Sequence, residues 1–458
     1  MKKNSLLKSL LIMYVAIVVL SWFVPAGVYS NGQFSNSGVA PVGLINLFRI
    51  PVMTFQTFIQ YTIVFLSIGI LYGVLNKTGV YDNILKGIAK KWKGKEKLLI
   101  ILTSILFALI GSLTGLSTFA FLLVPFVAAI LLLSGYDKMS ALLATIGALL
   151  IGEVASVFGF SGAGYIINVF NLKMFDEIIT RIILFVILTG LYVFFIAKKT
   201  KVQTKKEENI PFLVVDSKNN KKKLPLVIVS VLFVLLALVG MYNWYYGFGI
   251  EVFNNLDAKV QGITWLSRLL NGITALGYWG NYEFAIAIVI FTFVIAWLYN
   301  IKLKDLADGV KEGFKEMLPI ALYATICNII FTVMLLSSSN MYATIVNALG
   351  TVKSTFNLPI ASLISLSGSI FYNDFYYMLT NCTAFFAGYE AAYYPVLGVL
   401  VTGIYGLAMM VLPTSIVLVA GLKYFDISYT EWLKKMWKYL LCALVILLLI
   451  VLIVAALI

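Results

Sequence analysis

Apolar segments of about 20 residues recur from one end of this sequence to the other, each long enough for a helix to cross the roughly 30 Å hydrocarbon core of a bilayer. Of the 458 residues, 61% are hydrophobic and 12% are charged. Soluble domains carry roughly 25% charged residues. No polar stretch is long enough to build a separate water-soluble domain. The sequence therefore predicts an all-α polytopic membrane protein.

Nine apolar segments are expected to cross the membrane, and two more are expected to enter and leave on the same side. The crossings are predicted at about 6–24, 51–75, 141–170, 178–197, 224–242, 282–301, 317–336, 393–422 and 439–458. The stretches at about 98–134 and 358–387 are predicted to be re-entrant hairpins, because the flanking charges then fall on consistent sides. Two alternatives stay open. The first stretch fits two full helices packed through small residues, and the second fits an external loop.

Lys and Arg are distributed unevenly between the two sides that this topology defines. With a cytoplasmic N-terminus, 28 of the 34 basic residues fall on the inside. By the positive-inside rule this bias supports that orientation, and nine crossings then put the C-terminus outside. We expect a multi-pass protein of a bacterial-type plasma (inner) membrane. This placement accounts for the net charge of +14. The expected partners are the lipid bilayer and a small molecule, and nucleic acid is not among them.

Five parts follow from this reading. They are a first helix with an external loop (1–50), a first repeat (51–197), a cytoplasmic linker (198–223), scaffold helices with an external loop (224–301) and a second repeat (302–458). The linker is strongly polar, with nine lysines, three acidic residues and Pro211. The segment from Leu6 to Val24 is similar to a signal peptide, but it is long for one and further spans follow, so it is expected to remain as the first helix.

The two halves of the chain contain matching short motifs in the same order. Ile110–Ser112 corresponds to Ser367–Ser369, and Gly135–Asp137 corresponds to Gly388–Glu390. An apolar run with a polar break follows each Gly-Tyr-acid motif. The breaks are Phe160-Ser161-Gly162 and Pro413-Thr414-Ser415. Because the two Gly-Tyr-acid motifs fall on opposite sides, the sequence predicts two inverted-topology repeats, each with a re-entrant hairpin and a broken transmembrane helix.

Polar residues inside the apolar segments are the candidates for a site. Glu153 is the one formally charged residue of the run 141–170, and a carboxylate at the centre of a bilayer costs about 3 kcal/mol. We expect it to bind a cation or proton, with a structural hydrogen bond to a neighbouring helix as the alternative. Asp374 is the second candidate for coupling. Hairpin tips and half-helix N-termini supply the predicted substrate-binding residues, namely Ser112, Thr114, Ser117, Thr118, Ser161, Ser369, Asn373, Asn381, Thr414 and Ser415.

Enzyme and metal chemistry find little support in the sequence. There is no histidine, and the three cysteines, Cys327, Cys382 and Cys442, lie in apolar segments without metal-ligand spacing. No Walker-type phosphate-binding motif is present. We expect no enzyme activity, no metal and no cofactor beyond Na⁺ or H⁺ used in coupling. A membrane-embedded enzyme and a channel remain the alternatives from other classes.

Several of these motifs resemble the ion transporter superfamily, and within it the anaerobic C4-dicarboxylate carrier and YfcC-like branch, which includes proteins regarded as basic amino acid antiporters. The resemblance rests on Trp22–Tyr29, Gly135–Asp137, Pro413–Ser415 and Ile427–Lys434. It implies paired hairpins, a sliding transport domain and a homodimer. The chain departs from the family pattern at Thr114-Gly115, where an acidic pair is frequent, and at Phe160–Gly164, where an Asn-Pro-Phe run is frequent.

The predicted site favours one class of substrate. It offers hydroxyls, amides and helix ends together with two carboxylates, and no Lys or Arg lies deep in the apolar segments. Two carboxylates would repel a doubly anionic substrate in a medium of low dielectric constant. We therefore expect a secondary active transporter for an amino acid, cationic ones included, that works by exchange or cation coupling. A C4-dicarboxylate carrier is the alternative.

Overall fold

The computed structural model describes residues 5–30, 33–202, 212, 222–336, 340–349 and 355–458. These residues are nearly all helical, with one two-stranded antiparallel sheet formed by β1 (Ala26–Ser30) and β2 (Gln33–Gly38). Among them, eight helices are long and apolar enough to cross a membrane. The prediction of an all-α polytopic membrane protein is confirmed, apart from this small sheet.

The helices follow one another along the chain with few long connections. In order they are α1 (Ser5–Leu20), α2 (Asn46–Lys77), α3 (Tyr81–Lys91), α4 (Glu96–Thr114), α5 (Ser117–Leu133), α6 (Lys138–Leu142), η1 (Leu143–Gly147), α7 (Ala148–Val154), η2 (Phe160–Gly164), α8 (Tyr165–Phe170), α9 (Ile178–Lys199), α10 (Leu224–Met241), α11 (Trp244–Phe248), α12 (Val252–Gly262), α13 (Thr264–Leu269), α14 (Asn281–Leu298), α15 (Leu303–Ile326), α16 (Ile329–Leu336), α17 (Met341–Leu349), α18 (Leu358–Phe371), α19 (Phe375–Phe386), η3 (Ala391–Tyr393), α20 (Tyr394–Met409), α21 (Ile416–Tyr424) and α22 (Tyr429–Ala455).

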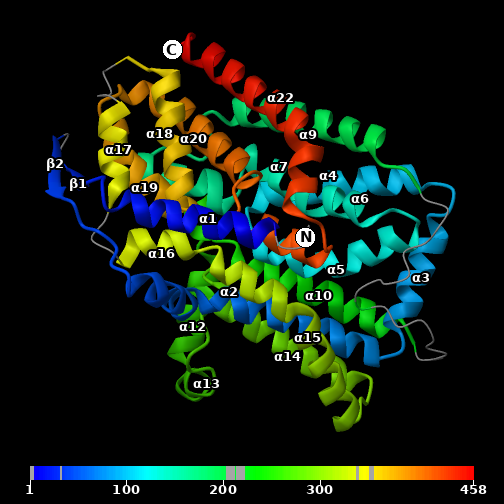
Figure 1. Cartoon of the computed structure of the whole chain (residues 1–458). Helices are drawn as coiled ribbons and strands as arrows, with labels where there is room; N and C mark the ends of the chain where they lie inside the picture. Colours follow the sequence, from blue (N-terminus) through cyan, green and yellow to red (C-terminus); the bar gives the residue numbers. More distant parts are fainter. Residues whose placement is uncertain (1–4, 31–32, 203–211, 213–221, 337–339, 350–354) are drawn as a thin grey trace.

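The bundle has two outer groups of helices with shorter helices between them. In Figure 1, α9 and α22 lie along one side, and α2, α14 and α15 lie along the opposite side. The paired helices α4–α5 and α18–α19 lie between these groups. This intermediate layer contains the elements in which sequence reasoning placed the site.

The two stretches predicted as hairpins are each a pair of helices joined by a short turn. Helix α4 ends at Thr114, and α5 begins at Ser117 after Gly115, whose φ of +64° is in the left-handed region that glycine tolerates. The second pair, α18 and α19, is joined by residues 372–374. Helix α4 is long enough to cross a membrane by itself. Re-entrance of these pairs therefore stays a prediction.

Both runs predicted as broken helices are interrupted. Helix α7 ends at Val154, and helical structure resumes at Phe160; α20 ends at Met409, and α21 begins at Ile416. In the second break Pro413 lacks the N–H that a continuing helix needs. The side chain of Ser415 then accepts a hydrogen bond from the backbone N–H of Leu418 at 3.4 Å, which caps the new helix.

Helices α2 and α15 form the most extensive helix pair of the described structure. They approach so closely that a Cβ atom at Gly73 would meet the carbonyl of Gly309. Farther along the pair, the hydroxyls of Thr62 and Thr325 lie 2.5 Å apart. Small residues allow close backbone approach in membrane helices. This contact ties the first half of the chain to the second.

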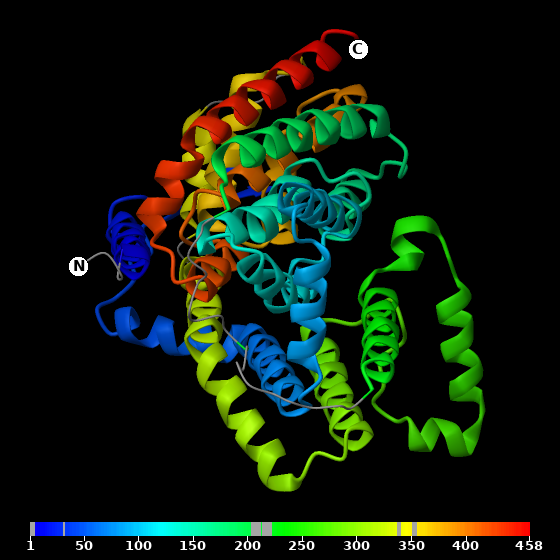
Figure 2. The same ribbon diagram turned by 90° about the vertical axis from the view of Figure 1, so that its right-hand side faces the viewer.

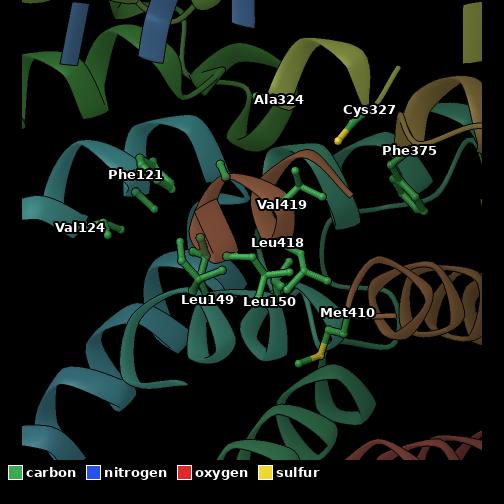
Figure 3. Close-up of a cluster of buried hydrophobic side chains, with 14 of the residues drawn as sticks. Phe121, Val124, Leu149, Leu150, Ala324, Cys327, Phe375, Met410, Leu418 and Val419 are labelled. Atoms are coloured by element: carbon green, nitrogen blue, oxygen red, sulfur yellow. The ribbon is translucent and has the colours of Figure 1, made fainter. Parts of the chain in front are cut away.

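The buried core also joins the two halves. Figure 3 shows a cluster of buried side chains that come from α5 and α7 in the first half and, in the second, from α15, α19, α21 and the residues that directly follow α15 and α20. Leu149, Val124, Leu418 and Val419 in this cluster are fully buried. The labelled members of the cluster are Phe121, Val124, Leu149, Leu150, Ala324, Cys327, Phe375, Met410, Leu418 and Val419.

Several predicted boundaries differ from the observed ones. The span expected at 6–24 is helical only to Leu20, because Pro25 disfavours helical backbone just before it. The span expected at 317–336 begins as early as Leu303. The loops that follow α1 and α10 contain the sheet and α11–α13, none of which was predicted. Most of the predicted linker, 203–211 and 213–221, lies outside the described residues.

Candidate functional site

A cavity of about 350 Å³ lies where the two helix pairs meet the two broken helices. Its wall also includes α2 and the residues that begin α14. The polar residues of the wall are Gln60, Tyr61, Ser117, Thr118, Glu153, Ser156, Ser161, Tyr165, Asn281, Asn373, Asp374, Thr402, Tyr405 and Ser415. Among the described residues that line this cavity, none is Lys or Arg. The cavity is large enough for a small organic ion, at the lower end of the roughly 300–1,000 Å³ of ligand sites.

Seven of the residues predicted from the sequence line this one cavity. They come from both halves of the chain and lie up to about 300 residues apart along the sequence, yet at one place in the fold. These seven are Ser117, Thr118, Glu153, Ser161, Asn373, Asp374 and Ser415.

The other five predicted residues lie outside the cavity wall. Three of them hydrogen-bond to a carbonyl of their own helix, as short polar side chains do in apolar surroundings: Thr114 to Ile110, Ser369 to Ser365 and Asn381 to Tyr377. Ser112 and Thr414 are buried behind the wall, at 0% and 1% exposure.

Ser112 holds the first break in place. Its hydroxyl donates to the carbonyl of Ala155 at 2.6 Å. Its own carbonyl accepts hydrogen bonds from the backbone N–H groups of Val157, Phe158 and Gly159, at 3.0 to 3.1 Å. The C-terminal end of α4 therefore supplies the hydrogen-bond partners that the backbone of the first break needs. The turn of the first helix pair and the first break form one unit.

Glu153 lies one residue before the end of α7 and faces the start of α5. Its carboxylate accepts a hydrogen bond from the hydroxyl of Ser117, the first residue of α5. The N-terminus of α5 carries the positive end of that helix's dipole, which stabilises a nearby negative charge. Glu153 thus has a partner in the neighbouring helix, as the structural alternative required, and it also lines the cavity.

The second helix pair is tied to the second break through Asn373. The side-chain amide of Asn373 donates to the carbonyl of Thr414 at 2.9 Å and to the carbonyl of Cys327 at 3.3 Å. The backbone carbonyl of Asn373 accepts a hydrogen bond from Tyr405 at 2.7 Å. The next residue, Asp374, caps α19 by accepting from the backbone N–H of Tyr377 at 3.1 Å.

Two polar atoms at this second junction are buried and have no hydrogen-bond partner among the described residues. They are the amide oxygen of Asn373 and the hydroxyl oxygen of Thr414. A buried polar atom without a partner costs about 1–3 kcal/mol, so such atoms are rare in native structures. Asn373 belongs to the wall of the ligand-sized cavity, whereas Thr414 is buried behind that wall.

Arg181 supports the first break from behind. Its side chain is 7% exposed and donates to three backbone carbonyls, those of Val157, Met174 and Asp176, at 2.6 to 2.7 Å. In the structure its guanidinium satisfies a carbonyl that the interrupted helix leaves free.

Sequence reasoning did not single out several residues of the wall. Gln60 and Tyr61 come from the middle of α2, and Tyr405 comes from α20. Asn281, the first residue of α14, lies near the first helix pair and accepts a hydrogen bond from Thr118 at 3.1 Å. Gln60 could have been recognised as a site candidate from the sequence, because it is an uncharged polar residue within the apolar run 51–75.

Comparison with known proteins identifies a family and similar solved structures. The sequence matches the family described as DcuC, C4-dicarboxylate anaerobic carrier, over residues 4–375. The fold is similar to the solved structure of the YdaH transporter of Alcanivorax borkumensis, with 12% sequence identity, coverage of 96% of both chains and a TM-score of 0.38. No curated protein matches the sequence.

Proposed function

The chain belongs to the C4-dicarboxylate anaerobic carrier family, and on that premise we propose that it moves C4-dicarboxylates across the membrane by secondary active transport. It is a transporter and not an enzyme, as the family match shows. The dicarboxylate was the alternative in the sequence analysis. Family membership moves it ahead of the amino acid that was expected first, because the match supports no amino acid substrate.

The observation that carries this proposal is the cavity of about 350 Å³ that lies between two junctions. The first junction is the contact of Ser117 with Glu153, and the second is the contact of Asn373 with Thr414. Helices α5 and α21 both begin at its wall, at Ser117 and just after Ser415. Helix N-termini attract carboxylates through the helix dipole and their free N–H groups. Helices α5 and α21 come from different halves of the chain. The N-terminus of each can therefore attract one end of a molecule that carries a carboxylate at both ends.

The two carboxylates of the wall require a counter-charge if the substrate is a dianion. Glu153 and Asp374 would repel it in a cavity of low dielectric constant. We therefore propose that H⁺ or Na⁺ binds with the substrate, at Glu153 and Asp374. The same two carboxylates, in a wall whose described residues include no Lys or Arg, favour the second candidate, an amino acid whose ammonium group pairs with one of them.

The remaining expectations accompany this proposal. We propose that the pairs α4–α5 and α18–α19 are re-entrant, that the two halves are inverted repeats and that the N-terminus is cytoplasmic in a bacterial-type plasma membrane. Exchange of one substrate for another is one mode of transport that this arrangement permits. A homodimer is proposed from the superfamily resemblance alone.

A binding measurement on purified protein tests the proposed substrate class. A specific ligand raises the unfolding temperature with the logarithm of its concentration over Kd. We expect succinate and fumarate to raise it in a saturable manner and to do so more strongly at low pH or with Na⁺. Arginine, ornithine and lysine serve as the comparison. Stabilisation by these amino acids, with none by either dicarboxylate, would overturn the proposal.

A further inference from the structure

Two short helices between α10 and α14 lie away from the rest of the molecule. Figure 2 shows α12 and α13, in green, standing apart from the bundle beyond α10, and Figure 1 shows them projecting from it as well. No residue of α12 or α13 is buried. An isolated helix of fewer than about 12 residues is marginal in water, so a helix such as α12, with 11 residues, needs a surface to rest on.

Helix α12 has one apolar side. At 3.6 residues per turn, Val252, Phe253, Leu256 and Val260 fall within an arc of about 100°. Asn, Asp, Lys and Gln residues occupy most of the remaining circumference. On the apolar side, Val252 is 65% exposed and Leu256 is 50% exposed. Phe253 is half-buried, with its ring beside Trp244 of α11, whereas Val252 and Leu256 remain exposed. This pattern is typical of a helix whose apolar face lies largely against a surface that the chain itself does not provide.

The lipid-facing surface of α10 continues toward this helix. Only five of the 18 residues of α10 are buried, and its exposed side chains are Leu, Val and Ile. Exposed Tyr245, Tyr246 and Phe248 follow at its end. Aromatic side chains are enriched at the boundary between membrane and water. Helix α12 begins at Val252, four residues after Phe248, and therefore starts at the depth of that boundary.

We propose that α12 and α13 lie along the membrane surface as an amphipathic anchor, with the apolar side of α12 in the outer part of the acyl chains. Trp265 and Leu269 of α13, which are 67% and 72% exposed, extend the contact. Lys259 and Arg268 near the helix ends can reach lipid phosphates. The anchor would hold the end of α10 and the start of α14, where Asn281 meets the cavity.

A lipid surface fits this helix better than a second copy of the chain. Stable protein interfaces bury roughly 1,200–2,000 Å². One side of an 11-residue helix presents four apolar side chains, which is too little for such an interface. A narrow apolar stripe bordered by polar residues is sufficient for binding at a lipid surface.

Spin labels on the full-length protein in bilayers of phosphatidylethanolamine and phosphatidylglycerol test this proposal. The matched pair is Leu256→Cys on the apolar side and Gln261→Cys on the opposite side, each in a Cys442→Ser background, since Cys442 is the exposed native thiol. Oxygen concentrates in the acyl chains, and a nickel chelate stays in water. We expect a higher oxygen collision rate at 256 and a higher nickel collision rate at 261.

Two other results would overturn the proposal. Equal nickel access at both positions would show that α12 is a solvated loop. Exclusion of both reagents from position 256, with spin–spin broadening between labels, would show that a second copy covers this side. Because neither readout involves transport, the test stands whether or not the substrate is a dicarboxylate.

Discussion

Ser117 donates a hydrogen bond to the carboxylate of Glu153, although the two residues lie 36 positions apart. The contact joins the N-terminus of α5 to the end of α7, so the first helix pair meets the first broken helix at an ionisable group. In the second half, Asn373 joins its helix pair to the second break through neutral amide bonds instead. The carboxylate of the second junction belongs to the neighbouring residue Asp374, so coupling through a proton or cation is expected at Glu153 and at Asp374.

Glu153→Gln removes the ionisable group and keeps its shape and its capacity to accept a hydrogen bond from Ser117. We predict that coupled uptake falls to background while the unfolding temperature stays near that of the wild type. Uptake with and without a pH or Na⁺ gradient measures this. Glu431→Gln is the matched control, because Glu431 caps α22 away from the cavity and Gln also suits that position. Wild-type uptake with unchanged ion dependence would make Glu153 structural.

Ser117→Ala removes the donor to Glu153. A hydrogen bond to a charged group contributes about 1.5–3 kcal/mol to stability, so we predict a loss of stability of that order, together with weaker apparent substrate affinity because Glu153 is no longer held at the cavity wall. The concentration dependence of uptake gives this affinity. Ser134→Ala in the same helix pair is the control, since the Ser134 hydroxyl only bonds to Ile130 of its own helix. Equal effects of the two changes would contradict a role for the Ser117–Glu153 contact.

Asn373→Ala breaks the bonds that join the second helix pair to Thr414 and Cys327. We predict a loss of stability of about 1–3 kcal/mol, together with weaker substrate binding. Thermal unfolding with and without succinate separates the two effects. Asn381→Ala is the control, because Asn381 lies outside the cavity wall and its side-chain amide donates to Tyr377 of its own helix. A change in stability without any change in the succinate-induced shift would place Asn373 outside substrate binding.

Arg181→Lys keeps the charge but loses the planar guanidinium that reaches three carbonyls at once. We predict a lower unfolding temperature and lower uptake, because the first break loses its support. Arg49→Lys, at an exposed position, should change neither property. If Arg181→Lys behaves like Arg49→Lys, the bonds seen at Arg181 are not needed to hold the break.

The orientation proposed from the basic residues has its own test. Single cysteines at Ser37, in β2, and at Lys95, just before α4, are introduced into a Cys442→Ser background. We predict labelling of position 95 from the cytoplasm only and of position 37 from outside only, with an impermeant thiol reagent on intact cells. Labelling of position 95 from outside would reverse the topology.

The helices of this fold were largely predictable because membrane spans have a strong local signal. Apolar runs gave the helix positions, and glycine or proline within them gave the breaks at 155–159 and 410–415. The sheet was missed, although Asn31-Gly32 between apolar and aromatic residues is a known hairpin signal. Helices α12 and α13 were missed because short amphipathic helices lack the long apolar run that marks a span.

The site was predictable in part, for a different physical reason. Several polar residues at a break or helix-pair turn, such as Ser161 and Asp374, line the cavity because the irregular backbone there faces it, although Thr114 and Thr414 lie at such places and do not. Polar residues farther along the helices, such as Ser369 and Asn381, can instead donate a hydrogen bond to a backbone carbonyl of their own helix. Tyr405 could not have been found from local pattern, because its position in the wall depends on tertiary packing.

Uptake by purified protein in proteoliposomes tests the central claim most directly. Labelled succinate and labelled arginine are compared at the same concentration, with an inward gradient of H⁺ or Na⁺ and with unlabelled competitors. We predict saturable succinate uptake that fumarate competes, that the gradient accelerates and that Glu153→Gln abolishes. Arginine, ornithine and lysine should not compete. Saturable arginine uptake that succinate and fumarate leave unchanged would contradict the account and favour the amino acid substrate.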